Sequence, residues 1–497
     1  MHHRFSLLHF VLVHCAGLAL LALALALAAG PARAQDFDVF GALRGPYQAG
    51  GKGQVLPGDA AAASCAETDS AALLEAPLGL AEAIRVALCN NPRARQSWYE
   101  AAAQAALVGT SKGAYLPTLS AGLNKSYDVN HNPNSSYNRR TTNQIEGANF
   151  TLNWLLLDGG GRQANVQAAQ QNLAAALAGQ DGTLQQIFVA AAQAYYEAAA
   201  GAAAVAAARQ AEETARESAQ AAEFKAQVGA ATKVDALQAR TAFSQATLAR
   251  VRAEGQARSA IGALAHALGV DVRSPLRLAA DEALDPEAES GPAPAEAFLQ
   301  RLDALIEEAI AAHPSLVAAR AQVAAAEARL AGLRSEGFPT LSLSHSGFLN
   351  GRPGTALPTS RTYERLTAIT LSFPIFEGFS RNYRLHEQRA QIEARRADLA
   401  GQQSQVAYEV WRAYEALQVE ASSLAATADL MRSAGEGLQA AKARYQAGAA
   451  DTIDLLNAQK DAANARQERI LALASWRLSR LRLLAGLGRL GFWALGA

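Results

Sequence analysis

The stretch that decides the fold is Arg162–Gln227, RQANVQAAQQNLAAALAGQDGTLQQIFVAAAQAYYEAAAGAAAVAAARQAEETARESAQAAEFKAQ. It contains no proline, and alanine, glutamine, glutamate and arginine dominate it, as they do Arg381–Ala447. At a rise of about 1.5 Å per residue, about 65 residues form a helical rod on the order of 100 Å long. Compact domains do not use such rods, so both stretches predict an elongated bundle or tube.

The two rods belong to a unit that the chain contains twice. Pro92 and Pro314 each follow an apolar-periodic stretch, and a second proline, Pro117 or Pro339, stands at the same distance further on in both halves. Beyond these prolines one constant offset relates the halves, which is the signature of a duplicated supersecondary unit. The pairs that share this offset are Asp158 and Glu377, Arg162 and Arg381, Gly229 and Gly448, Asp235 and Asp454, and Leu268 and Leu487.

The repeat divides the chain into units. Asp, Pro and Glu accumulate between the halves, and the periodicity stops there. Each repeat is expected to run helix, strand, strand, long helix and returning helix, with its two shorter helices stacked end to end beside the long one. The predicted segments are a signal peptide over residues 1–34, a flexible N-terminal segment over 35–76, a first repeat over 77–269, an equatorial inter-repeat linker over 270–300, a second repeat over 301–490 and a C-terminal tail over 491–497.

Each half contains two strands in which apolar and polar residues alternate. Polar loops are expected between the paired strands, over Asn130–Asn143 and Asn350–Tyr363. An apolar face of this kind points inward in a soluble sheet and toward lipid in an outer-membrane barrel, and the strands alone leave both readings open. The residues of the apolar face are Leu119, Ala121, Leu123, Tyr127 and Val129, then Ala148, Phe150, Leu152 and Trp154, then Leu341, Leu343 and Leu349, then Ile369, Leu371 and Phe373.

The number of strands restricts the assembly. Single-chain membrane barrels begin at about eight strands, so four strands do not close one. An open four-stranded sheet in lipid leaves its edge groups without hydrogen bonds, which is prohibitively costly. Either the sheet lies outside a membrane, or several chains share one barrel. Combined with the long rods and an export signal, the pattern favours the shared barrel.

The N-terminus carries the features of that export signal. Arg4, an apolar run over residues 18–29 and the small-residue site Ala32-Arg33-Ala34 indicate a cleaved signal peptide, with a membrane-anchoring helix as the alternative. Two cysteines, Cys65 and Cys89, follow the cleavage site. An even cysteine count in an exported chain favours a disulfide between them, and the alternative is a buried, free Cys89.

Other features argue against catalysis, cofactors and nucleic acid. The 45 basic and 45 acidic residues balance, which gives no support to a nucleic-acid partner. Gly159–Ala164 satisfies the G-x-G-x-x-A dinucleotide pattern, but the following helix continues past Asp181 and no second parallel strand follows. We interpret Gly159, Gly160 and Gly378 as bends between strand and helix. The histidines have no metal-ligand spacing and no nucleophile elbow occurs, so no metal, no cofactor and no enzyme is predicted.

Three segments carry a resemblance to a known family: Leu80–Pro92, Trp154–Gly159 and Tyr445–Leu456. The order of these motifs along the chain and the duplication of the unit resemble the TolC family of outer-membrane efflux and secretion channels, over nearly the whole exported chain. The resemblance implies a fold of class α+β and a homotrimeric assembly. The 12-stranded β-barrel of this trimer is expected to lie in outer-membrane lipid and to continue as a long α-helical barrel through the periplasm. It also implies docking onto an inner-membrane transporter through a periplasmic adaptor protein.

The resemblance also implies a gate at the two helix-hairpin tips. Asp454 matches an aspartate whose ring narrows the tunnel and selects against anions, and Asn457 stands where some members carry a second aspartate. Tyr445 and Asp235 match positions that link neighbouring hairpins in the closed state. Ala450 replaces an arginine of the best-known members, so the usual charged latch is not expected here.

The acidic tip residues have an alternative, structural reading. Thr232-x-x-Asp235 and Asp451-x-x-Asp454 both resemble capping boxes at helix starts, in which the side chains satisfy free backbone N–H groups. A ring of acidic side chains that tunes cation passage is the functional reading. Gly229 and Gly448 are predicted to be the turn glycines of the two tips.

This resemblance implies a passive channel of a type I secretion system, which exports a protein such as an RTX toxin with energy from an inner-membrane ABC transporter. The Leu88–Pro92 signature, which includes Cys89, and the missing lipid anchor resemble the secretion branch. One alternative is the outer-membrane component of a multidrug efflux pump. The alternative from another class is a soluble periplasmic coiled-coil scaffold.

Overall fold

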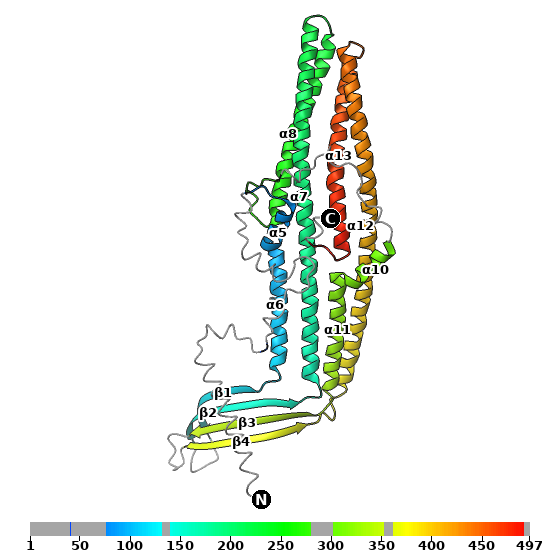
Figure 1. Cartoon of the computed structure of the whole chain (residues 1–497). Helices are drawn as coiled ribbons and strands as arrows, with labels where there is room; N and C mark the ends of the chain where they lie inside the picture. The colour runs from blue at the N-terminus through cyan, green and yellow to red at the C-terminus, as the bar shows by residue number, and fades with distance from the viewer. Residues whose placement is uncertain (1–39, 41–75, 132–139, 280–301, 352–360, 492–497) are drawn as a thin grey trace.

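The structure, a computed structural model, describes residue 40 and residues 76–131, 140–279, 302–351 and 361–491. The predicted signal peptide lies outside the described residues, as do nearly all of the N-terminal segment, most of the linker and nearly all of the tail. A sheet occupies one end of the molecule, and long helices extend from it to two hairpin tips at the opposite end (Figure 1). Both predicted rods are confirmed as single helices of 67 residues each, α7 (Gly161–Gln227) and α12 (Ser380–Gln446).

Shorter helices flank each rod in the same order. The first half contains α5 (Leu80–Asn90), α6 (Pro92–Gly113) and α8 (Lys233–Leu268). The second half contains α10 (Leu302–Ala312), α11 (Pro314–Ser335) and α13 (Thr452–Gly486). The helix breaks before Pro92 and Pro314 follow from local chemistry, because proline is tolerated in the first turn of a helix but not in its interior.

The sheet is antiparallel with the strand order β1-β2-β3-β4. Its strands are β1 (Thr118–His131), β2 (Arg140–Leu157), β3 (Thr340–Gly351) and β4 (Arg361–Ser372). The predicted loops Asn130–Asn143 and Asn350–Tyr363 were therefore too long at both ends. Polar composition was a misleading signal there, because backbone groups form the ladder and an exposed strand tolerates Asn, Thr and Arg.

Glycine contacts explain why the short helices stack end to end. Gly269 ends α8 with φ +70°, and a Cβ placed on it would lie 2.9 Å from the carbonyl oxygen of Asn90. Gly488, just beyond α13, has the same φ and would place a Cβ 2.8 Å from Cδ of Pro314. In each half the returning helix thus ends against the proline break of the first helix. Only glycine allows both the left-handed backbone and this close approach.

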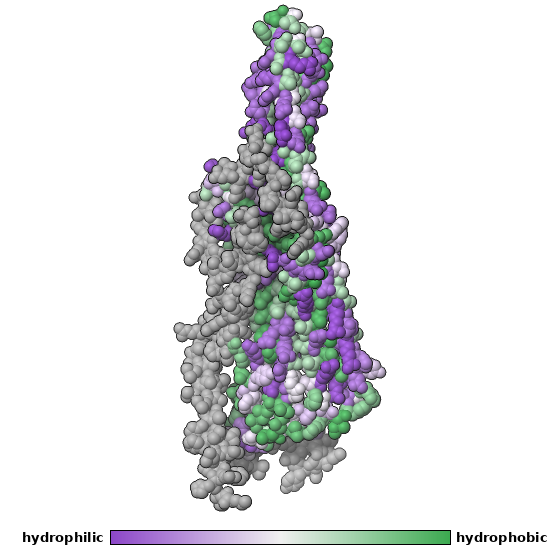
Figure 2. Space-filling view, turned by 45° about the vertical axis from the view of Figure 1, so that its right-hand side comes forward, coloured by the Kyte–Doolittle hydropathy of each residue, from purple (hydrophilic) through white to green (hydrophobic). Residues whose placement is uncertain are grey.

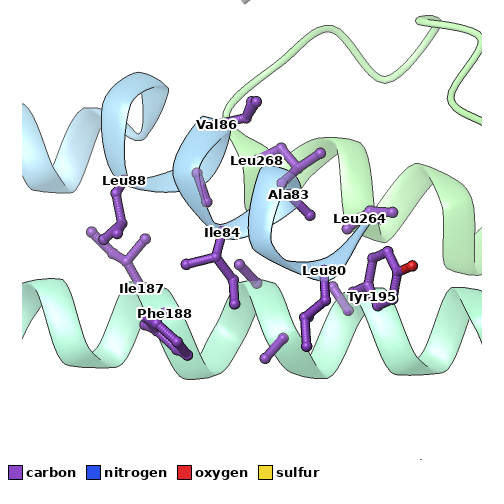
Figure 3. Close-up of a cluster of buried hydrophobic side chains, with 14 of the residues drawn as sticks. Leu80, Ala83, Ile84, Val86, Leu88, Ile187, Phe188, Tyr195, Leu264 and Leu268 are labelled. Atoms are coloured by element: carbon purple, nitrogen blue, oxygen red, sulfur yellow. The ribbon is translucent and has the colours of Figure 1, made fainter. Parts of the chain in front are cut away.

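The main apolar core lies at this level, where α5 covers α7 and the end of α8 (Figure 3). Leu80, Ile84 and Leu88 project from α5 toward α7, on which Phe188 is fully buried. Away from this core the helices pack through small residues, as their alanine content predicts. At Gly201 of α7, for example, a Cβ would lie 3.1 Å from Cα of Ala257 in α8.

Candidate functional site

The apolar face of the sheet is exposed. Leu123 is 90% exposed, Tyr127 71% and Ile369 69%, so the described helices leave this face uncovered. Hydrophobic surface is visible at the sheet end of the molecule in Figure 2. The opposite face carries Ser, Thr and Asn, as in the pair of Thr151 and Ser346, whose hydroxyl oxygens lie 3.4 Å apart. This arrangement favours the reading in which the apolar face meets lipid and the polar face meets water.

The bend from β2 into α7 is held by Arg162. Its guanidinium donates to the carbonyl oxygens of Leu155, at 2.6 Å, and Leu156, at 3.0 Å, and lies 4.7 Å from the ring centre of Tyr115. Asp158 accepts from the backbone N–H of Arg162 at 2.6 Å. Strand end and helix start are therefore joined rigidly at the boundary between sheet and rods.

The predicted bend glycines lie at the junctions of β2 with α7 and of β4 with α12. Gly159 and Gly160 have φ of +63° and +94°, and Gly378 has φ of +60°. A Cβ on Gly159 would lie 2.6 Å from Cβ of Phe338. Phe379 also has a φ of +60°, although it is not glycine, and sequence reasoning missed it. The available signal was its match to Gly160 under the repeat offset.

At the first tip, Gly229 (φ +75°) turns the chain, and Thr232 and Asp235 form a complete capping box at the start of α8. The backbone N–H of Asp235 donates to the Thr232 hydroxyl at 3.2 Å, and Asp235 accepts from the Thr232 N–H at 3.0 Å and from its hydroxyl at 2.8 Å. These bonds hold the pKa of Asp235 below its usual value, the hydroxyl bond most strongly. The carboxylate of Asp235 therefore serves its own helix.

The second tip is capped differently. Gly448 (φ +72°) turns the chain, and Asp451 is the N-cap of α13, accepting from the backbone N–H of Asp454 at 2.8 Å. The side chains of Asp454 and Asn457 are exposed. Because Asp451 carries the cap, the carboxylate of Asp454 is not required for it. Of the two aspartates that the repeat relates, Asp235 caps its own helix through its carboxylate, whereas Asp454 contributes a backbone N–H to the cap.

Two contacts join the tip of the first hairpin to the second. Nζ of Lys225, near the end of α7, lies 3.9 Å from the ring centre of Tyr445 on α12, in cation–π geometry. Further from the tip, Nε2 of Gln459 on α13 donates to the Ser218 hydroxyl on α7 at 2.8 Å. Tyr445 therefore meets Lys225, whereas Asp235 meets Thr232. Sequence reasoning missed Lys225, because an exposed-looking lysine in a polar helix carries no local signal.

Cys89 lies in the last turn of α5 and is disulfide-bonded. Cys65 lies outside the described residues, so the pairing of Cys65 with Cys89 stays a prediction.

Comparison with known proteins decides the family. The pattern of the outer membrane efflux protein family matches residues 83–270 and 305–489, one segment in each half. The chain belongs to this family. It is the TolC family that the sequence motifs indicated, and its members are channels rather than enzymes.

Two relatives and one solved structure illustrate the similarity. This outer membrane efflux protein is 33% identical over 421 residues to Protein CyaE of Bordetella pertussis, covering 83% of the chain and 85% of the relative. It is 25% identical over 355 residues to the outer membrane efflux protein BepC of Brucella suis, covering 71% and 73%. A crystal structure of a membrane protein from Pseudomonas aeruginosa matches the fold with a TM-score of 0.69 at 23% identity, covering 82% of the chain and 93% of that structure.

Family membership places the protein in the bacterial outer membrane as a channel, with its helical rods in the periplasm. Among the helices of the described part of the chain, none combines the length and the apolar character needed to span a membrane.

Proposed function

We propose that three copies of this chain form one channel, which serves as the outer-membrane exit of a type I secretion system. Each copy would contribute its four strands to a 12-stranded barrel and its helices to a periplasmic tunnel. The observation that carries the proposal is the exposed apolar face of a sheet that is too small to close by itself, at the end of rods on the order of 100 Å long.

In this proposal transport is passive, and energy comes from an inner-membrane ABC transporter that reaches the tunnel through a periplasmic adaptor. A wide tunnel needs no specific substrate pocket, so the transporter would select the cargo. A protein cargo is supported by the Leu88–Pro92 signature, which resembles the secretion branch of the family. The family description favours a second candidate, the efflux of small molecules.

The tips would form the periplasmic gate. An exposed Asp454 from each copy would place a ring of three carboxylates at the tunnel end, and Asn457, one helical turn further on, would add no charge. Such a ring attracts cations and repels anions. The gate of this chain would therefore depend on Asp454 and on the contacts that hold the two hairpins together.

Planar-bilayer recording of the purified protein tests the channel. We expect cation-selective conductance in the parent and reduced selectivity in D454A, with N457A as the matched neighbour that leaves selectivity unchanged. A protein that remains soluble without detergent and forms no pores would support the periplasmic scaffold instead. Crosslinking in cells followed by purification separates the two transport candidates, since an ABC transporter or an efflux pump would be recovered with the channel.

A further inference from the structure

The junction between β4 and α12 exposes three apolar side chains. Ile375 is 94% exposed, Phe376 73% and Phe379 65%. The rings of Phe376 and Phe379 meet edge to face, with their centres 5.5 Å apart. Apolar side chains that gather on the surface of a single chain mark a site that another molecule covers. We call these three residues the junction cluster.

Phe379 is unusual in its backbone as well as in its exposure. Its φ of +60° is left-handed, a conformation that is strained for a residue with a side chain. The bend itself does not need a phenylalanine, because the equivalent residue in the first half is Gly160, with φ +94°. As the N-cap of α12, Phe379 forms no side-chain hydrogen bond with the helix. Neither burial nor capping offsets the strain, which is typical of a position kept for a contact outside the chain.

The repeat shows in which direction the Phe379 side chain leaves the backbone. Gly159 presses against the segment between α11 and β3, where a Cβ on it would lie 2.6 Å from Cβ of Phe338. A Cβ on the next residue, Gly160, would meet nothing within 4 Å. Phe379 takes the place of Gly160, so its side chain points away from the side on which a neighbouring half packs. This geometry argues against a second copy as the molecule that covers the cluster.

The junction cluster continues the apolar face of the sheet. Leu157 comes opposite Leu341 on that face, and Phe376 is the repeat equivalent of Leu157. Charged surface begins next to the cluster, where Nη2 of Arg384 lies 3.8 Å from Oε2 of Glu377. The cluster therefore lies at a boundary between apolar and charged surface, at the sheet end of the molecule, where hydrophobic surface is visible in Figure 2.

We propose that the junction cluster inserts among the acyl chains of the glycerophospholipids in the periplasmic leaflet of the outer membrane. The cluster lies where α12 leaves the sheet, and the rods are periplasmic, so the leaflet at this level is the periplasmic one. Its side chains have no polar atoms, which suits acyl chains better than headgroups.

This anchor rests on the proposed function, in which the apolar face of the sheet meets lipid, and it adds residues that fix the depth of the sheet. Outer-membrane barrels carry aromatic girdles at the ends of their apolar band. Here the rings stand beyond the strand, on the bend into the helix. Each copy would carry one such anchor, because the first half has Leu157 and Gly160 in place of the two phenylalanines.

Photo-crosslinking of the full-length protein in cells tests the anchor. Phe376→p-benzoylphenylalanine and Phe379→p-benzoylphenylalanine keep an aromatic ring and bond to neighbouring C–H groups on irradiation. The cells are grown with tritiated glycerol, which labels glycerophospholipids and not lipopolysaccharide. We expect several-fold more tritium on the channel band from both variants than from Tyr408→p-benzoylphenylalanine. Tyr408 is the matched control, because it is an exposed aromatic residue of α12 about 40 Å along the helix from Phe379.

Ile369→p-benzoylphenylalanine separates the anchor from the proposed function, because Ile369 lies on the apolar face of β4 and is 69% exposed. Lipid label at Ile369 but not at the cluster overturns the anchor and leaves the lipid-facing sheet standing. A crosslink from the cluster to a second copy or to another protein does the same. No lipid label at any of these positions overturns the lipid-facing sheet, and the anchor with it. Ile375→p-benzoylphenylalanine repeats the test where a variant at Phe376 or Phe379 fails to reach the membrane.

Discussion

Replacing Lys225 by methionine should loosen the contact between the two hairpin tips, which is the closed state of the proposed gate. In the structure the Lys225 ammonium lies over the Tyr445 ring at 3.9 Å and joins the end of α7 to the second hairpin. Both side chains are half-buried, although most of the surrounding tip is exposed. K225M keeps the length of the side chain and removes its charge, so it removes the cation–π attraction with little change in packing.

The size of the effect follows from the setting of the pair. Cation–π contacts contribute about 0.5–1 kcal/mol at exposed sites and about 2 kcal/mol when desolvated, so a half-buried pair is worth about 1 kcal/mol. That energy changes the ratio of closed to open tips about fivefold for one chain. If three tips open together, about 3 kcal/mol is lost, and the ratio shifts by on the order of 100-fold.

Single-channel recording in planar bilayers measures this shift as open probability. K225M and Y445L should both raise it, because one lacks the cation and the other lacks the ring. Y445F keeps the ring and loses only the hydroxyl, so it should behave like the parent. D235N should also resemble the parent in open probability, since Asp235 is engaged with Thr232.

A different pattern would refute the reasoning. If Y445F and D235N opened the channel while K225M left it closed, the tips would be linked through the Tyr445 hydroxyl and the Asp235 carboxylate. That is the link implied by the family resemblance. The four variants therefore separate two latches that use the same tyrosine.

Three further predictions concern the stability of the protein, which is measured by thermal unfolding in detergent. G269A should destabilise the protein by about 2 kcal/mol or more, because Gly269 has a left-handed φ and a Cβ there would meet the Asn90 carbonyl. The control is G262A in α8, where a Cβ would meet nothing within 4 Å, and this variant should be neutral or stabilising. Burial raises the pKa of Asp181 to about 6, so its ionisation costs stability as the pH rises from about 4 to about 6. Above that window the free energy of unfolding of D181N should exceed that of the parent by about 1–2 kcal/mol, and below it the two should match. Burial lowers the pKa of His313, and the negative charge of Glu409 offsets part of this shift. Because the folded protein then binds a proton less readily than the unfolded chain, stability should fall as the pH drops through the usual histidine range. H313N should lose that pH dependence while keeping the N-cap of α11.

Each of these has an outcome that contradicts it. Equal melting temperatures for G269A and G262A would mean that the end of α8 does not press on the α5–α6 break. A stability difference between D181N and parent that does not vary with pH would place the effect in packing rather than ionisation. For His313, the equivalent N-cap is Asn91, which accepts from the backbone N–H of Arg93 at 2.9 Å. A pH-dependent H313N would therefore show that another group titrates.

Features with a local or periodic cause could be read from the sequence by itself. The rods follow from long stretches without proline, and the repeat follows from constant spacings that no tertiary contact is needed to detect. The strand pairs follow from alternation, and the turn glycines Gly229 and Gly448 follow from the backbone that a tight turn requires. The family was also accessible at this level, because its motifs keep their order along the chain.

The remaining features depend on which segments meet in space, and only the tertiary structure decided them. The apolar face of the sheet has the same alternation whether it is covered or exposed, and the exposure of Leu123 distinguishes the two. Polar strand ends continue the ladder because their partners lie opposite, which composition does not reveal. The Lys225–Tyr445 contact joins residues that are distant in sequence, and neither residue carries a local mark of the other. Packing between distant segments has no period along the chain, so the arrangement of the tips had to come from the folded molecule.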